Sequence, residues 1–208
     1  MTSFQEKYQP QTIGDLVFAD SDIRNLLTHY VAGNLNAHLL LYGPPGSGKT
    51  IAARVVGDHR NRNSETNGSL RISYPASRLN NEGSIEILNN EIGHQRMFAS
   101  DYPIIIIDEI DQLKANLQHE LRNFIDDQPA VTLIVTTNYL HNVQEALCDR
   151  FDKYEVLHPT REDWFNRVKH ILTSEGVDAT DTIVEKLLNN WNGSARDLMR
   201  HLEKFCHT

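Results

Sequence analysis

The residues Gly43 to Thr50, which read GPPGSGKT, have the types and spacing of a loop that binds phosphate groups. Its glycines let backbone N–H groups converge on phosphate oxygens, and it opens a helix whose N-terminus carries a partial positive charge. Lys49 is placed to reach the outer phosphates of ATP, and Thr50 to bind Mg²⁺. The spacing therefore predicts a nucleotide site, whose residues are Gly43, Pro45, Gly46, Ser47, Gly48, Lys49 and Thr50.

Two carboxylates follow four consecutive isoleucines in the sequence IIIIDEID. A buried strand there would deliver Asp108 and Glu109 to the edge of the sheet where the phosphates are expected. We expect Asp108 to hold the magnesium ion, and Glu109 to orient and deprotonate the attacking water. Asp111 has two interpretations of equal weight, as a site residue or as a negative charge favoured at a helix N-terminus.

Polar residues end a third apolar run, in which VTLIV is followed by Thr136, Thr137 and Asn138. Such a cluster indicates that a group at this point needs hydrogen bonds. Asn138 is a candidate to position the lytic water against the γ-phosphate. The alternative is an asparagine that starts a turn.

Short apolar runs that alternate with helical patterns predict a doubly wound α/β fold with a parallel sheet and a site at the carboxyl ends of the strands. A nucleotide-binding α/β domain is expected over residues 1–158, and a three-helix lid over 159–208, where only helical patterns remain. Thr160 and Asp163 resemble a capping box at the start of the lid, and Ser194 a cap of its last helix. The expected strands lie at His38 to Gly43, Leu70 to Pro75, Pro103 to Glu109, Val131 to Asn138 and Lys153 to His158.

The helical stripe expected for the last helix consists of Ala195, Leu198, Met199, Leu202 and Phe205. Another helix is expected over Asp181 to Trp191, with Ile183 and Leu187 on its apolar side. The polar stretch from Asp58 to Ser69 is predicted to be a flexible surface loop.

The composition fits a globular protein without a membrane segment. With 39% apolar and 23% charged residues, the chain of 208 residues can bury a core. The net charge of -8 argues against a globally basic, nucleic-acid-coating surface. Cys148 and Cys206 have no metal-ligand spacing, so we expect a reducing, cytoplasmic location, and no apolar run is long enough to span a bilayer.

These motifs resemble those of AAA+ ATPases, and in particular those of the small subunits of sliding-clamp loaders of the replication factor C type. Six of them occur in the family's order along nearly the whole chain. They are EKYQPQTIGDL at Glu6 to Leu16, the loop at Gly43 to Thr50, DEID at Asp108 to Asp111, Asn138, LCDRF at Leu147 to Phe151, and GSARDL at Gly193 to Leu198.

The resemblance implies roles that residue types alone would not suggest. Tyr8 and Pro10 would lie in the segment that wraps the adenine base. Arg150 would be an arginine finger that acts on the ATP of a neighbouring subunit, and Arg196 the lid arginine that touches the γ-phosphate of its own ATP. Judged by type alone, Arg150 would be a surface salt-bridge residue and Arg196 a solvated surface charge.

The resemblance also implies partners: a homo- or hetero-oligomeric ring or spiral, a sliding clamp and primer-template DNA. Asn89 and Asn90 stand where such subunits tend to carry a basic residue, which leaves Arg78 and Arg96 as the cations of the expected DNA face. Gln9 and Asp149 replace the family's usual arginine and serine. Since a collar domain would follow the lid and the sequence stops at residue 208, we expect a minimal form, or a viral one in the host cytoplasm.

Two other functions use the same phosphate loop. A helicase-loader-like AAA+ protein would act on a protein partner. A monomeric small-molecule kinase would need no arginine from a neighbour, and its turnover per subunit would not rise with protein concentration.

Overall fold

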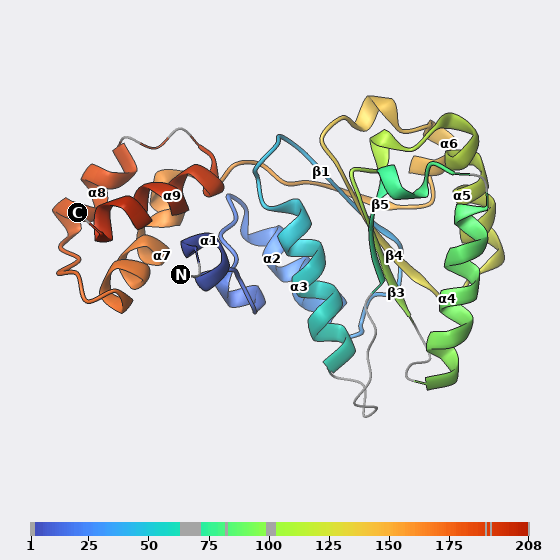
Figure 1. The fold of residues 1–208 in the computed structure, drawn as a ribbon, viewed down its shortest axis with the longest axis horizontal. Helices are drawn as coiled ribbons and strands as arrows, with labels where there is room; N and C mark the ends of the chain where they lie inside the picture. The colour runs from blue at the N-terminus through green and yellow to red at the C-terminus, as the bar shows by residue number, and fades with distance from the viewer. Residues whose placement is uncertain are drawn as a thin grey trace.

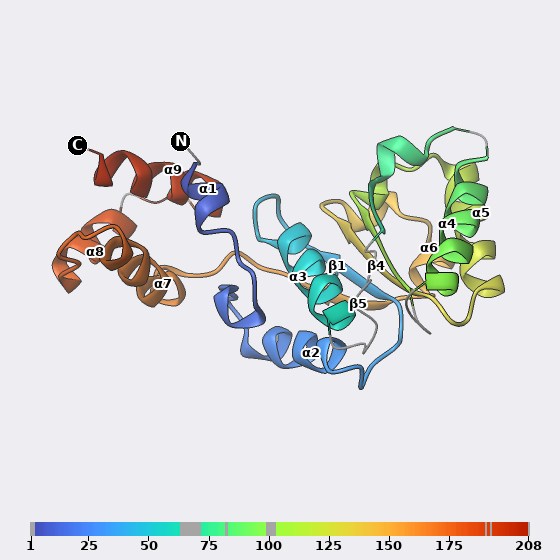
Figure 2. The ribbon, with the colours of Figure 1, turned by 60° about the horizontal axis from the view of Figure 1, so that its bottom comes forward.

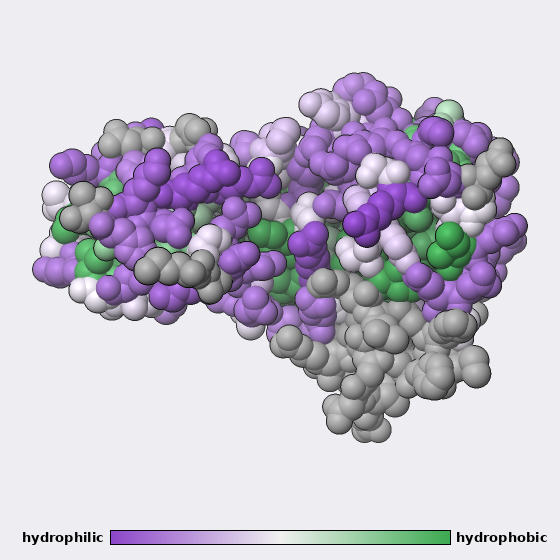
Figure 3. Space-filling view, viewed as in Figure 1, coloured by the Kyte–Doolittle hydropathy of each residue, from purple (hydrophilic) through white to green (hydrophobic). Residues whose placement is uncertain are grey.

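The protein consists of an α/β part at one end of its long axis and a smaller helical part at the other end (Figure 1). This computed structural model describes residues 3–62, 72–81, 83–98, 103–189, 191 and 193–207. In the space-filling view, most of the described surface on the face shown is hydrophilic (Figure 3). Within the described ranges, no helix is both long and apolar enough to cross a bilayer.

Five parallel strands form the sheet, in the order β2-β3-β4-β1-β5. The expected doubly wound fold is therefore confirmed, with every predicted strand present. Their bounds are Leu39–Tyr42 for β1, Ile72–Pro75 for β2, Ile104–Asp108 for β3, Thr132–Thr137 for β4 and Asp152–Glu155 for β5.

Helices cover both faces of the sheet, which explains why the central strands are apolar throughout. Ile105 and Ile107 of β3 pack into one core cluster, and Ile104 and Ile106 into the other. Helices α2 (Ser21–Val31) and α3 (Lys49–Arg62) lie on one face, and α4 (Ser84–Phe98), α5 (Ala115–Asp127) and α6 (Glu145–Cys148) on the other (Figures 1 and 2). Among the described residues of this part there are also four short 3₁₀ helices: η1 (Ile13–Asp15), η2 (Ala76–Leu79), η3 (Ile110–Gln112) and η4 (Leu140–Asn142).

Three helices after β5 pack around a core of their own, as the sequence predicts: α7 (Arg161–Ser174), α8 (Asp181–Asn189) and α9 (Ala195–Cys206). The capping box of Thr160 with Asp163 is present, and the Ser194 side chain accepts from the backbone N–H of Asp197. Phe205 departs from the expected stripe and is 39% exposed, because α9 runs beyond Leu202, the last buried residue of the stripe.

The N-terminal helix α1 (Phe4–Lys7) packs against α9 rather than against the sheet (Figure 2). Phe4 is 3% exposed and belongs to the core of the helical part. The domain boundary at His158 stays a prediction, but the helical part includes residues from both ends of the described chain.

The loop expected over Asp58 to Ser69 is wrong over Asp58 to Arg62, since α3 continues to Arg62. Polar side chains do not by themselves end a helix, because each further residue still gains one backbone hydrogen bond. The rest of that stretch, 63–69, lies outside the described residues.

Candidate nucleotide-binding site

The phosphate loop joins β1 to α3, where its backbone depends on glycine. Gly43 has φ of 143°, and a Cβ atom there would lie 2.3 Å from the carbonyl oxygen of Val156. Gly48, directly before α3, has φ of 97°, a backbone conformation that residues with a Cβ atom rarely adopt. The loop is therefore pressed against the segment after β5 and leads into the N-terminus of a 14-residue helix.

Lys49 is folded back on the loop that precedes it. Its Nζ donates to the carbonyl oxygens of Gly43 at 2.9 Å and Pro44 at 2.8 Å, and to Ser47 Oγ at 3.4 Å. Burial lowers the pKa of Lys49 to about 8, although Asp108 and other nearby carboxylates act in the opposite direction. The ammonium group thus rests on weak neutral acceptors that an anionic phosphate would replace.

Asp108 lies at the carboxyl end of β3 and accepts two hydroxyl hydrogen bonds on the same oxygen. Thr50 Oγ1 donates to Asp108 Oδ1 at 2.7 Å, and Thr136 Oγ1 of β4 donates to that oxygen as well. A hydroxyl and a carboxylate oxygen side by side fit Mg²⁺, which prefers oxygen ligands and commonly takes one or two from protein and the rest from phosphate and water.

Glu109 adopts a left-handed backbone conformation, with φ of 58° and ψ of 51°. Among the described residues other than glycine, it alone has a positive φ. Its backbone N–H donates to Thr136 Oγ1 at 3.1 Å, and its carboxylate accepts from Gln112 Nε2 at 2.6 Å. Such strain is often stored at functional sites, and here it directs the side chain that follows the buried strand.

The polar residues at the end of β4 donate hydrogen bonds to the carboxylates next to them. Thr137 Oγ1 donates to Asp111 Oδ1 at 2.6 Å, so Asp111 is tied to β4 and does more than place a charge at a helix end. Asn138 follows β4 directly and is half-buried. The cluster at the end of this strand therefore meets a hydrogen-bonding need, as its sequence indicates.

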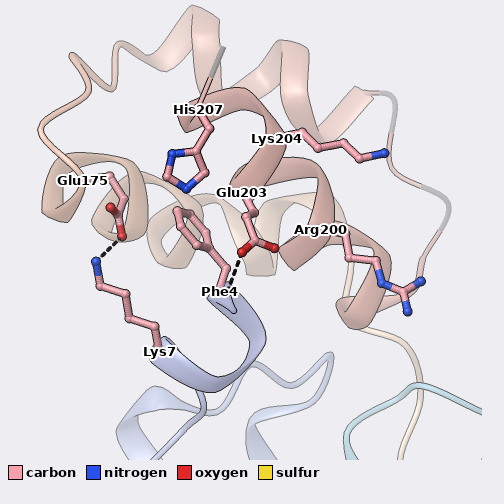
Figure 4. Close-up of a pocket in the computed structure, with 7 residues that line it drawn as sticks. All are labelled: Phe4, Lys7, Glu175, Arg200, Glu203, Lys204 and His207. Carbon is pink, nitrogen blue, oxygen red and sulfur yellow. Dashed lines mark hydrogen bonds and ion pairs between the residues drawn. The ribbon is translucent and has the colours of Figure 1, made fainter. Parts of the chain in front are cut away.

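The N-terminal segment lies with the helical part. Tyr8 Oη donates to Glu175. Lys7 Nζ lies 2.6 Å from the same carboxylate, and the Phe4 N–H donates to Glu203 at 3.2 Å (Figure 4). Pro10 is half-buried in the extended link to η1. A cavity of about 610 Å³ at this junction is lined by Phe4, Lys7, Glu175, Arg200, Glu203, Lys204 and His207, none of which belongs to the phosphate loop.

Arg167 of α7 fastens that link. Its Nη2 donates to the backbone carbonyl of Tyr8 at 3.1 Å, and its Nη1 lies 3.1 Å from Asp15 Oδ1. Hydrogen bonds from the side chain and backbone of Thr12 help to lower the pKa of Asp15 despite its partial burial, with the charge of Arg167 a further cause. The segment expected to meet the adenine base is thus attached to the helical part.

The two proposed arginines lie outside the cluster around Asp108. Arg150 follows α6, a helix at the end of the molecule opposite α7, α8 and α9 (Figure 1). Its Nε and Nη2 donate to Asp126 at 3.0 and 3.1 Å. Arg196, the second residue of α9, is exposed and forms no ion pair with any residue that the structure describes.

The helical part nevertheless approaches the phosphate loop at Gly46. A Cβ atom on Gly46 would lie 3.7 Å from Ser194 Oγ and 3.9 Å from His158 Cε1. His158 Nδ1 is buried and has no hydrogen-bond partner in the described part of the chain. The loop, the link after β5 and the start of α9 therefore meet at one point.

Comparison with known proteins agrees with this geometry. Residues 39–158 match the family described as "ATPase family associated with various cellular activities (AAA)". The chain belongs to the AAA family of ATPases. This AAA chain is 28% identical over 203 residues to replication factor C subunit 5 of Mus musculus, and 29% identical over 212 residues to replication factor C subunit 3 of Schizosaccharomyces pombe.

Those alignments cover 95% and 97% of this AAA chain, but it spans only 58% of the length of either relative. Among solved structures, the Thermotoga maritima RuvB Holliday junction branch migration motor has a TM-score of 0.75, 19% identity, and coverage of 93% of this chain and 63% of that one. At that identity the likeness concerns the fold alone.

Within the AAA chain, the structure brings Lys49, Thr50, Asp108 and Glu109 to one edge of the sheet, with Asn138 after the neighbouring strand. Tyr8 and Arg150 instead have partners away from that edge, in Glu175 and Asp126, and no described contact ties Pro10 to it. Arg196 follows Ser194, which lies near Gly46, but makes no described contact with the edge itself. Sequence reasoning did not single out Gln112, although its spacing of three residues from Glu109 was a usable signal. His158 gave no signal, because a lone histidine belongs to no motif.

Proposed function

We propose that this AAA chain binds ATP with Mg²⁺ and hydrolyses it. Lys49 and the loop Gly43 to Thr50 would hold the phosphates, while Thr50 and Asp108 would hold the metal ion. Glu109 would deprotonate the attacking water, which Asn138 would help to position. The observation that carries the proposal is the shared oxygen of Asp108, which accepts from the phosphate-loop helix and from the neighbouring strand.

We further propose that hydrolysis requires a neighbouring subunit in a ring or spiral. Arg150 is exposed and follows α6, which lies at the end of the molecule opposite the lid helices, so it is poorly placed to serve the same nucleotide as Arg196. An arginine in trans can contribute about 10³–10⁵ in rate. Arg196 would reach the γ-phosphate when the lid closes, and Tyr8 and Pro10 would contact the base.

A complementation experiment tests the trans role. Arg150→Ala protein keeps an intact nucleotide site but should hydrolyse ATP slowly. Lys49→Ala protein should not bind nucleotide, yet it still supplies Arg150. Mixing the two should restore turnover above the sum of the separate activities.

Particle size, measured with and without a non-hydrolysable ATP analogue, shows whether mixed assemblies form. Additive activity in demonstrated mixed assemblies would exclude a trans role. Turnover per subunit that is independent of protein concentration would favour the monomeric kinase instead.

The finer role that we propose is clamp loading in replication, on a sliding clamp and primer-template DNA, in the cytoplasm. Its support is the likeness to replication factor C subunits. The sparse cations count against tight DNA binding: Arg78 of η2 is exposed, and the side chain of Arg96 lies outside the described residues. A helicase-loader-like role with a protein partner is the second candidate, favoured by the net charge of -8.

DNA binding separates these two roles. Labelled primer-template DNA should bind at low salt only with an ATP analogue, because several subunits must align their few cations. The salt slope should reflect about 0.9 counterion per phosphate contacted. Combined Arg78→Ala and Arg96→Ala should abolish binding, whereas Arg200→Ala on the lid should not. Binding without nucleotide, or untouched by the double change, would favour the protein partner.

A further inference from the structure

The side chain of Arg150 is held on one edge by a carboxylate of another helix. Its Nε donates to Asp126 Oδ1 at 3.0 Å and its Nη2 to Asp126 Oδ2 at 3.1 Å, a two-point contact with a single carboxylate. Its Nη1 also donates to the carbonyl oxygen of Ala146 at 3.3 Å. These contacts use three of the five N–H groups of a guanidinium and leave one on each Nη atom.

The free edge of this guanidinium reaches solvent. The side chains of Arg150 and Asp126 are 36% and 48% exposed. The pair contributes little to folding stability, because solvent screens exposed ion pairs and fixing two side chains costs entropy. The contact instead holds the Arg150 side chain in one orientation, whereas a free arginine side chain would sample many rotamers.

The position of Asp126 in its helix also indicates that it serves Arg150 rather than the stability of α5. Asp126 and Asp127 are the last two residues of α5, and no basic residue lies in that last turn. Negative charge is disfavoured at a helix C-terminus, where the backbone already presents a partial negative charge. A carboxylate at position 126 is therefore unfavourable for α5 itself, and the groups that compensate its charge are Arg150, Arg122 and His38.

We propose that Asp126 is a positioning residue, which holds Arg150 so that its two remaining N–H groups face the nucleotide of a neighbouring subunit. This inference rests on the proposed trans role of Arg150. Asp126 itself would touch neither nucleotide nor water. Its effect would come from a smaller loss of side-chain entropy when Arg150 meets the phosphate.

Turnover at saturating ATP, in assemblies of the full chain, tests this role. Asp126→Ala should lower kcat by about 2–10-fold, the cost of ordering one long side chain, and leave the KM for ATP unchanged. Asp126→Glu should retain part of the lost rate, because it keeps the carboxylate. Asp127→Ala is the matched control, since Asp127 is the exposed neighbour at the same helix end, and it should keep full turnover.

A double-mutant cycle decides whether Asp126 acts through Arg150. In an Arg150→Ala background, Asp126→Ala should have no further effect. The inference is overturned if Asp126→Ala turns over as fast as the wild type, if it slows the Arg150→Ala protein further, or if it alone prevents assembly. Wild-type turnover of Arg150→Ala itself would instead refute the proposed trans role.

Discussion

The carboxyl edge of the sheet differs from the arginines Arg150 and Arg196 in one respect. The contacts of the edge are already made within a single subunit, whereas the arginines still lie apart from it. At the edge, Lys49 is 5% exposed and Asp108 accepts from two threonine hydroxyls. Arg150 and Arg196 are exposed, and no described contact brings either of them to that edge. The core of the proposed site is therefore organised without a ligand, whereas the arginines need a neighbour or a lid movement to join it.

The largest expected effect separates the residues of this edge that bind nucleotide from those that hydrolyse it. Lys49→Ala should abolish nucleotide binding, because it removes the cation that meets the phosphates. Glu109→Gln should keep binding but slow hydrolysis by about 10²-fold or more, since the carboxylate is needed chiefly in the transition state. Calorimetric titration with ATP and steady-state turnover measure the two quantities. Equal losses of affinity in both variants would contradict the assigned roles.

A smaller effect compares the stability of the two regions. Thr136→Val keeps the shape of the side chain but removes the hydroxyl that serves Asp108 and the Glu109 N–H. We expect the free energy of unfolding in urea to fall by about 1–3 kcal/mol, the cost of polar groups left unpaired. Arg196→Ala should change it by less than about 0.5 kcal/mol, because that side chain is exposed.

Thr173→Val is the matched control for the threonine change, since its hydroxyl donates to a backbone carbonyl on the exposed side of α7. A loss at Thr136 no larger than the loss at Thr173 would show that the hydroxyl network of the edge is not structural. An Arg196→Ala protein that hydrolyses ATP at the wild-type rate would remove Arg196 from the site.

The smallest effect concerns pH and Lys49. Burial lowers its pKa to about 8, so between pH 8 and its ordinary value the unfolded chain holds a proton that the folded chain has lost. The stability contributed at this group therefore rises with pH over that window. Nucleotide phosphate would favour the charged form, so binding should take up a proton, and affinity should fall by up to about tenfold per pH unit above 8.

Affinity for ADP measured from pH 7 to 9.5 tests this prediction. Lys49→Arg is the control, because arginine stays charged throughout this range. The slope should be much flatter in the arginine variant. Equal slopes in the two proteins would assign the pH dependence to another group.

The sequence predicted the edge of the sheet well for physical reasons. Ile104 to Ile107 indicate a strand buried on both faces, and parallel strands place their carboxyl ends together, so Asp108 had to lie near Thr50 and Thr136. The glycine loop also has a local cause, since Gly46 and Gly48 have φ of 82° and 97°, a backbone conformation that residues with a Cβ atom rarely adopt.

Contacts between distant segments could not be predicted in the same way. Nothing local indicates that Tyr8 meets Glu175, or that Arg150 meets Asp126, because each pairing depends on how separate elements pack. The end of α3 has a different cause: the polar residues from Asp58 predict a loop, but such residues are equally compatible with a helix, which continues to Arg62.

The seating of α1 on α9 has a mechanical consequence for the lid. The chain crosses between the two parts twice, once in the link from Gln9 to Thr12 and once between Val156 and Thr160. Because the helical part is attached at these two separate points, its easiest movement is a rotation about the line that joins them. Arg167 anchors the first crossing to the moving side. Lid closure in this protein should therefore be a rotation about one axis, with the phosphate loop at Gly46 close to that axis.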